Sequence, residues 1–281
     1  MVLLSLCAEA RAQTEPKEKD TIRIGNIIIT RDPNKSSDYG IDNTHIIWGK
    51  RHNGKLSNVS TNWLILDFGM ANYVDETNYN APSTYLYNRP GAVPLGKNDF
   101  DLREGKSVNV NIWFFIQRLN LIKHYVNLKY GLGIELNNYR YTTNANISYL
   151  ENNPYVPPQY STAVIIRDSI QFSKNKLALD YLTVPLMLNF STNPGYLNKG
   201  LSLSVGVSAG YLYDQRNKQI SPERGKLKNK HDFDIETFKF SYIAELGLGP
   251  VKLYGSYSPV SFYERDLDMK PYTIGIRFSN W

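Results

Sequence analysis

The feature that most constrains the fold is a period-two alternation of apolar and polar residues, which begins at Trp63 and recurs to the end of the chain. Side chains of a strand point to opposite faces in turn, so this alternation predicts strands with one apolar and one polar face. The clearest case is 201–213, where Leu, Val, Ala and Tyr alternate with Ser and Gly. Eight segments share the pattern: 63–73, 107–119, 125–139, 177–190, 201–213, 238–249, 251–258 and 272–281.

The connections between these segments alternate between long and short. Long or medium connections cover about 74–106, 142–176, 214–237 and 259–271, and short ones cover 120–123, 193–199 and 249–250. Up-and-down membrane barrels have this property because long loops face outside and tight turns face the periplasm, whereas a Greek-key sandwich has no reason to alternate so regularly. The expected fold is therefore all-β: an eight-stranded antiparallel up-and-down transmembrane β-barrel.

Composition is compatible with this fold. No run approaches the roughly 18 apolar residues of a membrane-spanning helix, and a barrel keeps the mean hydropathy low because polar lumen-facing residues alternate with lipid-facing ones. The chain has 21 Tyr against 11 Phe and 4 Trp, and Tyr suits a membrane–water boundary. The net charge of +6 comes from scattered residues without a nucleic-acid module, so we expect no nucleic-acid partner.

The residues before the alternation predict export. Residues 1–12 indicate a signal peptide remnant, with an apolar stretch at 2–6 and the small-x-small triplet Ala10-Arg11-Ala12, so we expect cleavage after Ala12. Cleavage removes the one cysteine, Cys7, and with it any disulfide. We expect 13–62 to form a periplasmic N-terminal segment with a short strand or hairpin, and 63–281 to form the barrel.

The polar faces of the predicted strands place charged residues inside the barrel. An eight-stranded barrel is just wide enough to be filled by its own side chains, and an unpaired buried charge is very costly. We therefore expect the charges to pair across the lumen as a packed plug rather than line a transport path. The residues concerned are Asp67, Lys129, Glu135, Glu245, Lys252 and Arg277.

The predicted loop 214–237 is rich in basic residues. These groups are suited to charge-assisted contacts with lipopolysaccharide phosphates; the alternative is a solvated loop of mixed charge. The loop 142–176 is rich in Tyr and Pro, a composition of binding surfaces and of ordinary stiff loops alike. The basic candidates are Arg216, Lys218, Arg224, Lys226, Lys228 and Lys230.

No motif predicts catalysis, a cofactor or a metal. The four histidines have no metal-ligand spacing and no evident Ser and acid partners for a lipid hydrolase: they are His45, His52, His124 and His231. The acidic cluster Asp99, Asp101 and Glu104 lacks the remaining ligands and the glycine of a calcium loop. We expect it to be a solvated acidic loop.

Three stretches carry a family resemblance. Residues 62–73 (NWLILDFGMANY), 180–190 (DYLTVPLMLNF) and 272–278 (YTIGIRF) resemble strands of the outer-membrane β-barrel family of Bacteroidota that includes the PorT-like proteins. The resemblance covers roughly 63–281 and implies location in the outer membrane. Two departures stand out: Trp281 is out of phase with Phe278, and Pro185 deletes a ladder donor, which implies a bulge or local break.

Three functional hypotheses follow. The first is a non-enzymatic barrel that, if PorT-like, supports protein secretion or surface assembly. The second is a structural or adhesion barrel that binds lipopolysaccharide or a surface ligand through its outer loops. The third and least favoured is a lipid-modifying enzyme. The expected partners are outer-membrane lipid and lipopolysaccharide, with secretion-system or surface proteins under the first hypothesis.

Overall fold

The computed structural model describes residues 56–143, 145–151, 163–194, 200–248 and 251–279, and the backbone of three strands within 20–48. Residues 1–12 with their expected cleavage site, His52 and Trp281 lie outside the described residues. The chain forms two compact units, Met1–Lys55 and Leu56–Trp281. Within the described residues, none of the helices has the length and apolar character needed to cross a membrane.

The first unit contains a small antiparallel sheet where the sequence predicted a strand or hairpin. Its strands are β1 (Asp20–Ile24), β2 (Ile27–Arg31) and β3 (Thr44–Trp48), in that order. The isoleucines at 22 and 29 are cross-strand partners, so the apolar alternation noted in the sequence lies at the β1–β2 pairing.

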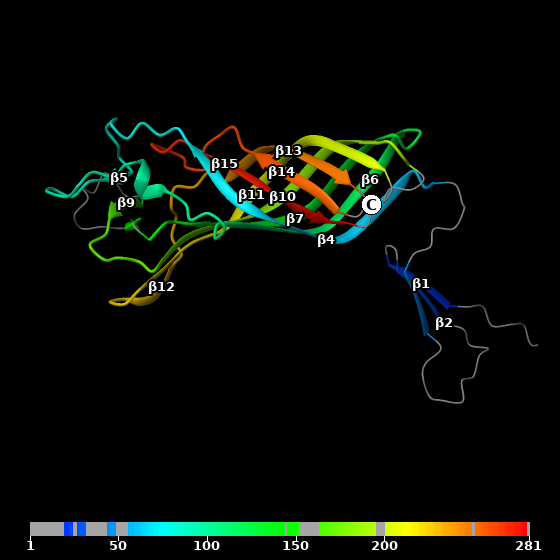
Figure 1. The fold of residues 1–281 in the computed structure, drawn as a ribbon, viewed down its shortest axis with the longest axis horizontal. Coiled ribbons are helices and arrows are strands. Elements are labelled where there is room, and N and C mark those ends of the chain that lie inside the picture. Colours follow the sequence, from blue (N-terminus) through cyan, green and yellow to red (C-terminus); the bar gives the residue numbers. More distant parts are fainter. Residues whose placement is uncertain are drawn as a thin grey trace, which may run out of the picture. The chain divides into compact units, whose positions relative to one another are not determined.

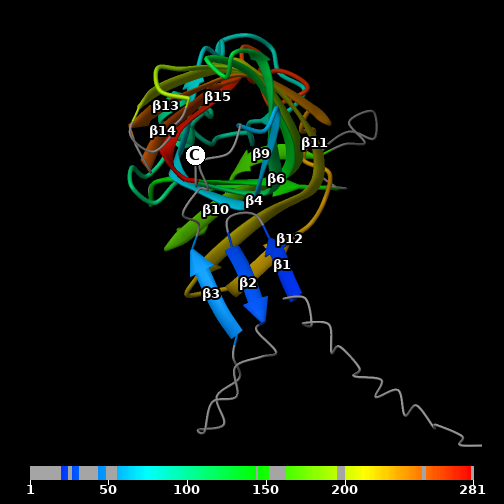
Figure 2. The same cartoon turned by 90° about the vertical axis from the view of Figure 1, so that its right-hand side faces the viewer.

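The second unit is built on eight antiparallel strands that are hydrogen-bonded in a closed ring (Figure 1). The ring closes where β15 pairs with β4, from Met269 opposite Asp75 to Phe278 opposite Leu66. Figure 2 shows the closed ring. All eight predicted strand segments belong to it. The strands are β4 (Val59–Asp75), β6 (Val108–Ile122), β7 (Val126–Arg140), β10 (Lys174–Ser191), β11 (Leu201–Ser221), β13 (Phe238–Leu248), β14 (Val251–Tyr257) and β15 (Met269–Phe278).

One predicted connection is wrong in its first half. Residues 214–221 were expected to belong to a loop, but β11 continues to Ser221 and turns back as β12 (Gly225–Asn229), which pairs with it. The buried set on β11 changes from even-numbered residues such as Ser208 to the odd-numbered Asn217, Gln219 and Ser221, because the pairing with β10 shifts by one residue between Leu212 and Asp214. Because the phase shifts and outward positions such as 216 and 218 are basic rather than apolar, the hydropathy pattern did not mark this part of the strand.

The long connections gather at one end of the ring and carry short elements. These are β5 (Leu86–Tyr87), β8 (Ile147–Leu150), β9 (Val164–Arg167) and a 3-10 turn at Lys97–Phe100. The three strands form a separate sheet in the order β5-β9-β8. Long loops of outer-membrane barrels face the cell exterior, so this end is the outer one.

Pro185 produces the local break that its position predicts. On the β7 side the ladder omits Val184 and Pro185 between the pairs Thr183–Gly133 and Leu186–Tyr130. On the β11 side pairing is continuous, with Pro185 opposite Ser208. The register with β7 is the same on both sides of the gap, so the residue interrupts the ladder without a bulge.

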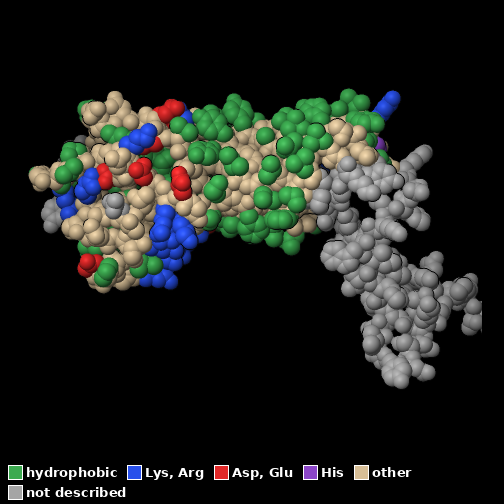
Figure 3. All heavy atoms as spheres, viewed as in Figure 1, with side chains coloured by type: hydrophobic (Ala, Val, Ile, Leu, Met, Phe, Trp, Pro, Cys, Tyr) green, Lys and Arg blue, Asp and Glu red, His purple; other side chains and the backbone are tan. Residues whose placement is uncertain are grey.

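The outer face of the ring is an apolar belt. On β10, exposed Leu182, Val184, Leu186, Leu188 and Phe190 alternate with buried residues. Equivalent residues on the neighbouring strands extend the belt, which is green in Figure 3. An exposed apolar surface of this extent marks contact with lipid or a partner, and a ring-shaped belt of alternating strands is the lipid-facing band of a transmembrane barrel.

The belt makes a prediction about charge. Leu186→Arg places a cation in the middle of the lipid-facing part of β10, and we expect a loss of about 2–4 kcal/mol in the free energy of unfolding. Val93→Arg, on a loop residue that is 72% exposed, should change it by no more than about 0.5 kcal/mol. Urea unfolding in lipid vesicles measures both; equal effects would contradict a lipid-facing belt.

Candidate functional site

The ring interior contains a charge network drawn from five strands. Arg277 on β15 bridges Asp67 on β4 at 2.8 Å and Glu245 on β13 at 2.6 Å. Lys129 on β7 approaches the same Glu245 at 2.7 Å, and Lys252 on β14 lies 3.5 Å from it. Each of these side chains is at most 6% exposed. The structure thus brings together five of the six charges that the sequence placed inside the barrel.

The sixth, Glu135, belongs to a second ion pair nearer the outer end of the ring. It pairs with Lys239 on β13, which the sequence reading had not singled out. Lys239 lies at the start of β13 between Phe238 and Phe240, which are both exposed. Alternation of the two faces would therefore have predicted that Lys239 points inward. Asn137 and Thr183 also donate hydrogen bonds to the Glu135 carboxylate.

Neutral polar side chains complete the packing around Asp67. Trp113 donates its indole N–H to Asp67 Oδ2 at 2.7 Å, and Asn111 donates to the same oxygen at 3.1 Å. The Arg277 guanidinium lies over the Trp113 ring, 5.2 Å from its centroid. A buried polar network is stable only if its members are satisfied, and these contacts meet that need for the carboxylate.

Two glycines make room for the ring of Tyr254. Gly69 and Gly275 are cross-strand partners, and a Cβ on either would lie 2.6 or 2.7 Å from a Tyr254 side-chain atom. Tyr254 then reaches Asn109, to which its hydroxyl donates at 2.5 Å. Glycines therefore leave space that a large neighbouring side chain fills, as expected for the packed interior of a barrel of this strand number.

The outer end of the ring is closed by a loop cap, which we define as the long connections together with the buried aromatic and aliphatic cluster that they form with the outer ends of the ring strands. Tyr139 stacks on Phe262 with ring centroids 5.3 Å apart, and Tyr149 packs on Phe233 at 4.9 Å. Other members are Tyr85, Leu95, Phe100, Tyr141, Ile147, Ile165, Leu179, Tyr181, Tyr263, Leu267 and Met269. Several of the chain's tyrosines therefore belong to this core rather than to a membrane–water boundary.

Three tyrosine hydroxyls form a chain within the loop cap. The hydroxyls of Tyr141 and Tyr149 lie 2.8 Å apart, and those of Tyr149 and Tyr263 lie 2.6 Å apart. Burial raises the pKa of Tyr141 to about 12 and that of the other two well above the ordinary value. All three stay protonated at neutral pH, so each retains a hydrogen to donate.

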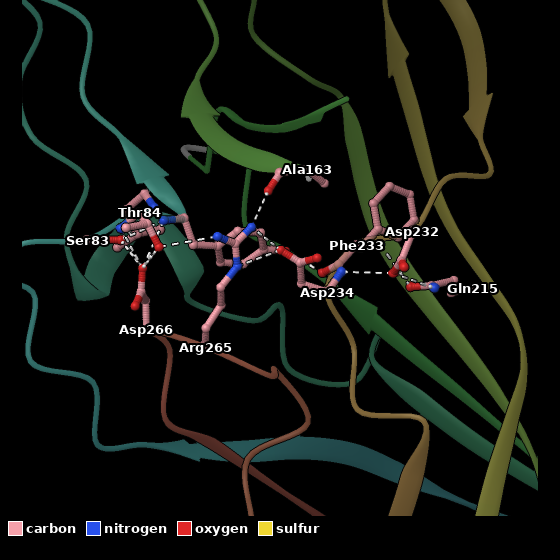
Figure 4. Close-up of polar contacts among 11 residues, drawn as sticks. Ser83, Thr84, Ala163, Gln215, Asp232, Phe233, Asp234, Arg265 and Asp266 are labelled. Atoms are coloured by element: carbon pink, nitrogen blue, oxygen red, sulfur yellow. Dashed lines mark hydrogen bonds and ion pairs between the residues drawn. The ribbon is translucent and has the colours of Figure 1, made fainter. Parts of the chain in front are cut away.

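Polar contacts at Arg265 and Asp266 join separate loops of the cap (Figure 4). Arg265 donates to Asp234 Oδ2 at 2.8 Å, to the Ala163 carbonyl at 3.3 Å and to Thr84 Oγ1 at 3.2 Å. Asp266 accepts hydrogen bonds from Ser83 Oγ and from the backbone N–H groups of Thr84 and Tyr85. Burial opposes ionisation of Asp266, but these donors outweigh it and lower its pKa.

The acidic cluster is solvated at two of its three residues, and the prediction is wrong for Asp99. Asp99 is 8% exposed, because its carboxylate pairs with Arg167 at 2.6 Å and caps the 3-10 turn through the Gly96 N–H. Asp101 and Glu104 are exposed. Within the described residues, no three His, Cys, Asp or Glu side chains are grouped so as to hold a metal ion.

The six basic candidates divide into two groups. Arg216 pairs with Asp180 at 2.5 Å and also with Asp214, Arg224 pairs with Asp168 at 2.9 Å, and Lys230 pairs with Asp214 at 2.9 Å. Lys218, Lys226 and Lys228 have no acidic partner among the described side chains and lie on β11 and β12 rather than on a loop.

The remaining candidates do not assemble a reactive site. His231 lies beside Glu151 at 2.5 Å on the outer end, His124 lies in the β6–β7 turn, and His45 lies on β3. A cavity of about 230 Å³ opens where β13 and the 258–262 segment separate, with Tyr181, Lys239 and Phe262 among its lining residues. Ser258 and Ser261 also line it, without a histidine beside them.

The charge network makes a prediction about stability. Arg277→Met leaves the buried Asp67 carboxylate without its cation, whereas Glu245 keeps Lys129 and Lys252. We expect a loss of about 3–5 kcal/mol in the free energy of unfolding. Lys230→Met, which removes a largely exposed pair, should cost no more than about 1 kcal/mol. Asp67→Asn added to Arg277→Met should recover part of the loss in urea titrations. A double variant less stable than Arg277→Met would contradict the pairing.

Asp266 makes a prediction about the loop cap. Asp266→Asn removes the charge that strengthens its hydrogen bonds, while asparagine tolerates the backbone φ of 63° at this position. We expect trypsin to cut the outer loops roughly ten-fold faster, the factor for a loss of about 1.4 kcal/mol. Gel migration without heating checks that the ring is intact. Asp101→Asn, on an exposed carboxylate, is the control; equal cutting of both variants would be the contrary result.

Matches to solved structures include two of low similarity. A crystal structure of Ail, the attachment invasion locus protein of Yersinia pestis, matches 79% of this chain and 100% of its own at 11% identity, with a TM-score of 0.31. The complex of that protein with the heparin analogue sucrose octasulfate matches 78% and 98% at 11% identity, with a TM-score of 0.28. TM-scores this low do not establish a shared fold.

Comparison with sequence families is decisive. No curated protein matches the sequence. The family model described as an outer membrane protein beta-barrel domain matches residues 73–258, which is more than half of the chain. That range runs from the end of β4 to the end of β14, and it contains Lys129, Glu245 and Lys252 of the charge network, whereas Asp67 and Arg277 lie outside it. The chain therefore belongs to the outer membrane protein beta-barrel domain family, and its ring lies in the outer membrane.

Proposed function

We propose that this protein is a non-enzymatic, non-conducting eight-stranded barrel that presents its loop cap for recognition at the cell surface. The observation that carries the proposal is the loop cap itself, in which loops far apart in sequence share one buried core and are tied by Arg265 and Asp266. Ordering such loops costs conformational entropy. A barrel that served only as a membrane anchor would not need that order.

The packed interior supports the non-conducting part of the proposal. The ions at Asp67, Lys129, Glu245 and Arg277 neutralise one another at 2.6–2.8 Å and are almost fully buried. A solute crossing the ring would have to separate these pairs, which is very unfavourable. The loop cap adds a second barrier at the outer end.

The recognition part rests on what the loop cap leaves exposed. Residues 89–94 are all exposed, yet their backbone is held by Arg167, which donates to the carbonyls of Val93 and Pro94 at 3.2 Å. Binding by a segment that is already ordered loses less entropy than binding by a flexible loop. This segment is therefore the part of the loop cap we assign to ligand contact.

Support of secretion by a PorT-like protein is the competing hypothesis. It rests on the resemblance of three strands, and the family match concerns the barrel domain in general. Lipid modification is a third hypothesis, which an analysis of lipid A from cells with and without the gene tests. The loop cap favours recognition over both, because neither secretion support nor lipid chemistry explains an ordered exposed segment.

The test compares cells that lack the gene with cells complemented by the parent or by a variant whose residues 89–94 are replaced by Gly and Ser. Adhesion to monolayers of epithelial cells and of the producing bacterium is measured alongside the profile of secreted proteins. Surface amount and gel migration without heating show that the variant is folded. We expect both the deletion and the variant to lose at least ten-fold in adhesion to one monolayer, with secretion unchanged.

Two results would overturn the proposal. Unchanged adhesion in the deletion strain, with secreted proteins trapped in the periplasm, would establish secretion support in its place. Steady ion conductance of the purified barrel in a planar bilayer would contradict the closed lumen.

A further inference from the structure

A row of four basic residues crosses four adjacent strands on the outside of the ring. Arg140 on β7 is the cross-strand partner of Lys176 on β10, which is the partner of Lys218 on β11, which is the partner of Lys228 on β12. Directly opposite residues share a face, with Cβ atoms about 4.5–5.5 Å apart. Their chain neighbours Tyr139, Asn175 and Asn217 are buried, so the four cations point outward.

Two further lysines widen the row into a patch. Lys174 on β10 and Lys226 on β12 each lie two residues from a member of the row, on the same face, and both face Ile220 on β11. We call these six residues the cation patch: Arg140, Lys174, Lys176, Lys218, Lys226 and Lys228. None of the six forms an ion pair with an acidic side chain in the part of the chain that the structure describes.

The acidic groups closest along the same strands are already engaged. Asp180 on β10 and Asp214 on β11 both pair with Arg216, and Asp214 also pairs with Lys230. Asp168 is held by Arg224. The one remaining acid on the β11–β12 hairpin, Glu223, is exposed at its turn. The patch therefore carries a net positive charge that the protein itself does not neutralise.

Stability does not explain this arrangement. Like charges directly opposite each other on adjacent strands are destabilising, and here three such oppositions follow in one line. The mutual repulsion is visible at Lys176, which lies beyond the apolar belt and outside the part of β10 that spans the membrane. Partial burial and the neighbouring Lys174, Arg216 and Lys218 lower its pKa to about 8.

The position of the patch shows which layer of the membrane it faces. On β10 the exposed apolar residues begin at Leu182, and Lys174 and Lys176 lie beyond that point toward the outer end. Figure 3 shows Lys and Arg side chains gathered beside the outer limit of the green belt, in the region where Figure 1 draws β12 and the ends of β10 and β11. Side chains at this level meet the headgroups of the outer leaflet.

We propose that the cation patch is a binding site for lipopolysaccharide, and that its lysines and arginine hold the phosphate groups of lipid A. The outer leaflet of the outer membrane presents these phosphates at the headgroup level, next to acyl chains that meet the apolar belt. A row of cations at strand spacing matches a molecule with more than one phosphate better than a phospholipid with one. Charge-assisted bonds to phosphate oxygens are strong, and they remove the repulsion within the row.

This site is separate from the loop cap and from whatever the loop cap recognises. It also differs from the six-residue loop site that the sequence suggested. Arg216, Arg224 and Lys230 are engaged with carboxylates, whereas Arg140, Lys174 and Lys176 come from strands that the sequence had not connected with the hairpin. The cross-strand register brings these residues together.

The test measures lipid binding to the purified full chain in neutral detergent by native mass spectrometry. The probes are diphosphoryl lipid A, lipid A without its phosphates, and phosphatidylglycerol. The test variant is Lys176→Gln/Lys218→Gln/Lys228→Gln. The control is Lys97→Gln/Lys123→Gln, which removes cations from exposed residues that lie outside both the cation patch and the 89–94 segment. Gel migration without heating confirms that both variants fold.

We expect diphosphoryl lipid A to bind the parent most tightly. The test variant should bind it roughly a hundred-fold more weakly, from about 1 kcal/mol for each basic residue at an anionic surface, and the control should bind as the parent does. Without lipid, the test variant should melt at a higher temperature than the parent because the repulsion is gone. Equal binding by the test variant and the control would overturn the site. Equal binding of phosphatidylglycerol and diphosphoryl lipid A would overturn the assignment to lipopolysaccharide.

Discussion

The structure depends on closure of the hydrogen-bonded ring. Backbone N–H and C=O groups that face lipid must be paired within the protein, and an open sheet would leave two edges unpaired. Pairing of β15 with β4 removes both edges. Closure with this number of strands also fixes the width of the interior, so the side chains that point inward must fill it and neutralise one another. The outward side chains are then left to lipid, which accounts for the exposed apolar belt.

The ring interior and the loop cap are both filled by buried side chains, but different interactions hold them together. Within the ring, every second residue of a strand points inward and its neighbours face lipid. Ion pairs around Glu245 and Asp67, supported by Trp113, fill the interior. At the outer end, loop residues such as Phe262 pack on inward rings at the strand ends such as Tyr139, and together they form an ordinary apolar core. Tyrosine suits this core because hydroxyls such as those of Tyr141, Tyr149 and Tyr263 bond to one another as they are buried.

On the outer face of the ring, beyond the apolar belt, the residues present are unfavourable for stability. Arg140, Lys176, Lys218 and Lys228 repel one another in a line, although the same strands place Arg216 between Asp180 and Asp214 in a balanced cluster. Violations of such local preferences are expected at functional sites. The cation patch and the exposed part of the loop cap are therefore the two surfaces that link this fold to its surroundings, one to the membrane lipid and one to the cell exterior.

The sequence by itself determined the strands, their number and the inward direction of Asp67, Lys129, Glu135, Glu245, Lys252 and Arg277, because alternation with period two is a local property. It also predicted the interruption at Pro185, since a missing N–H has the same effect in any ladder. Tertiary structure alone decided the pairing of Glu135 with Lys239, the burial of Asp99 against Arg167, and the line from Arg140 to Lys228. Each of these depends on register between strands distant in sequence, and register is set by ring closure and loop packing rather than by the residues of any one segment.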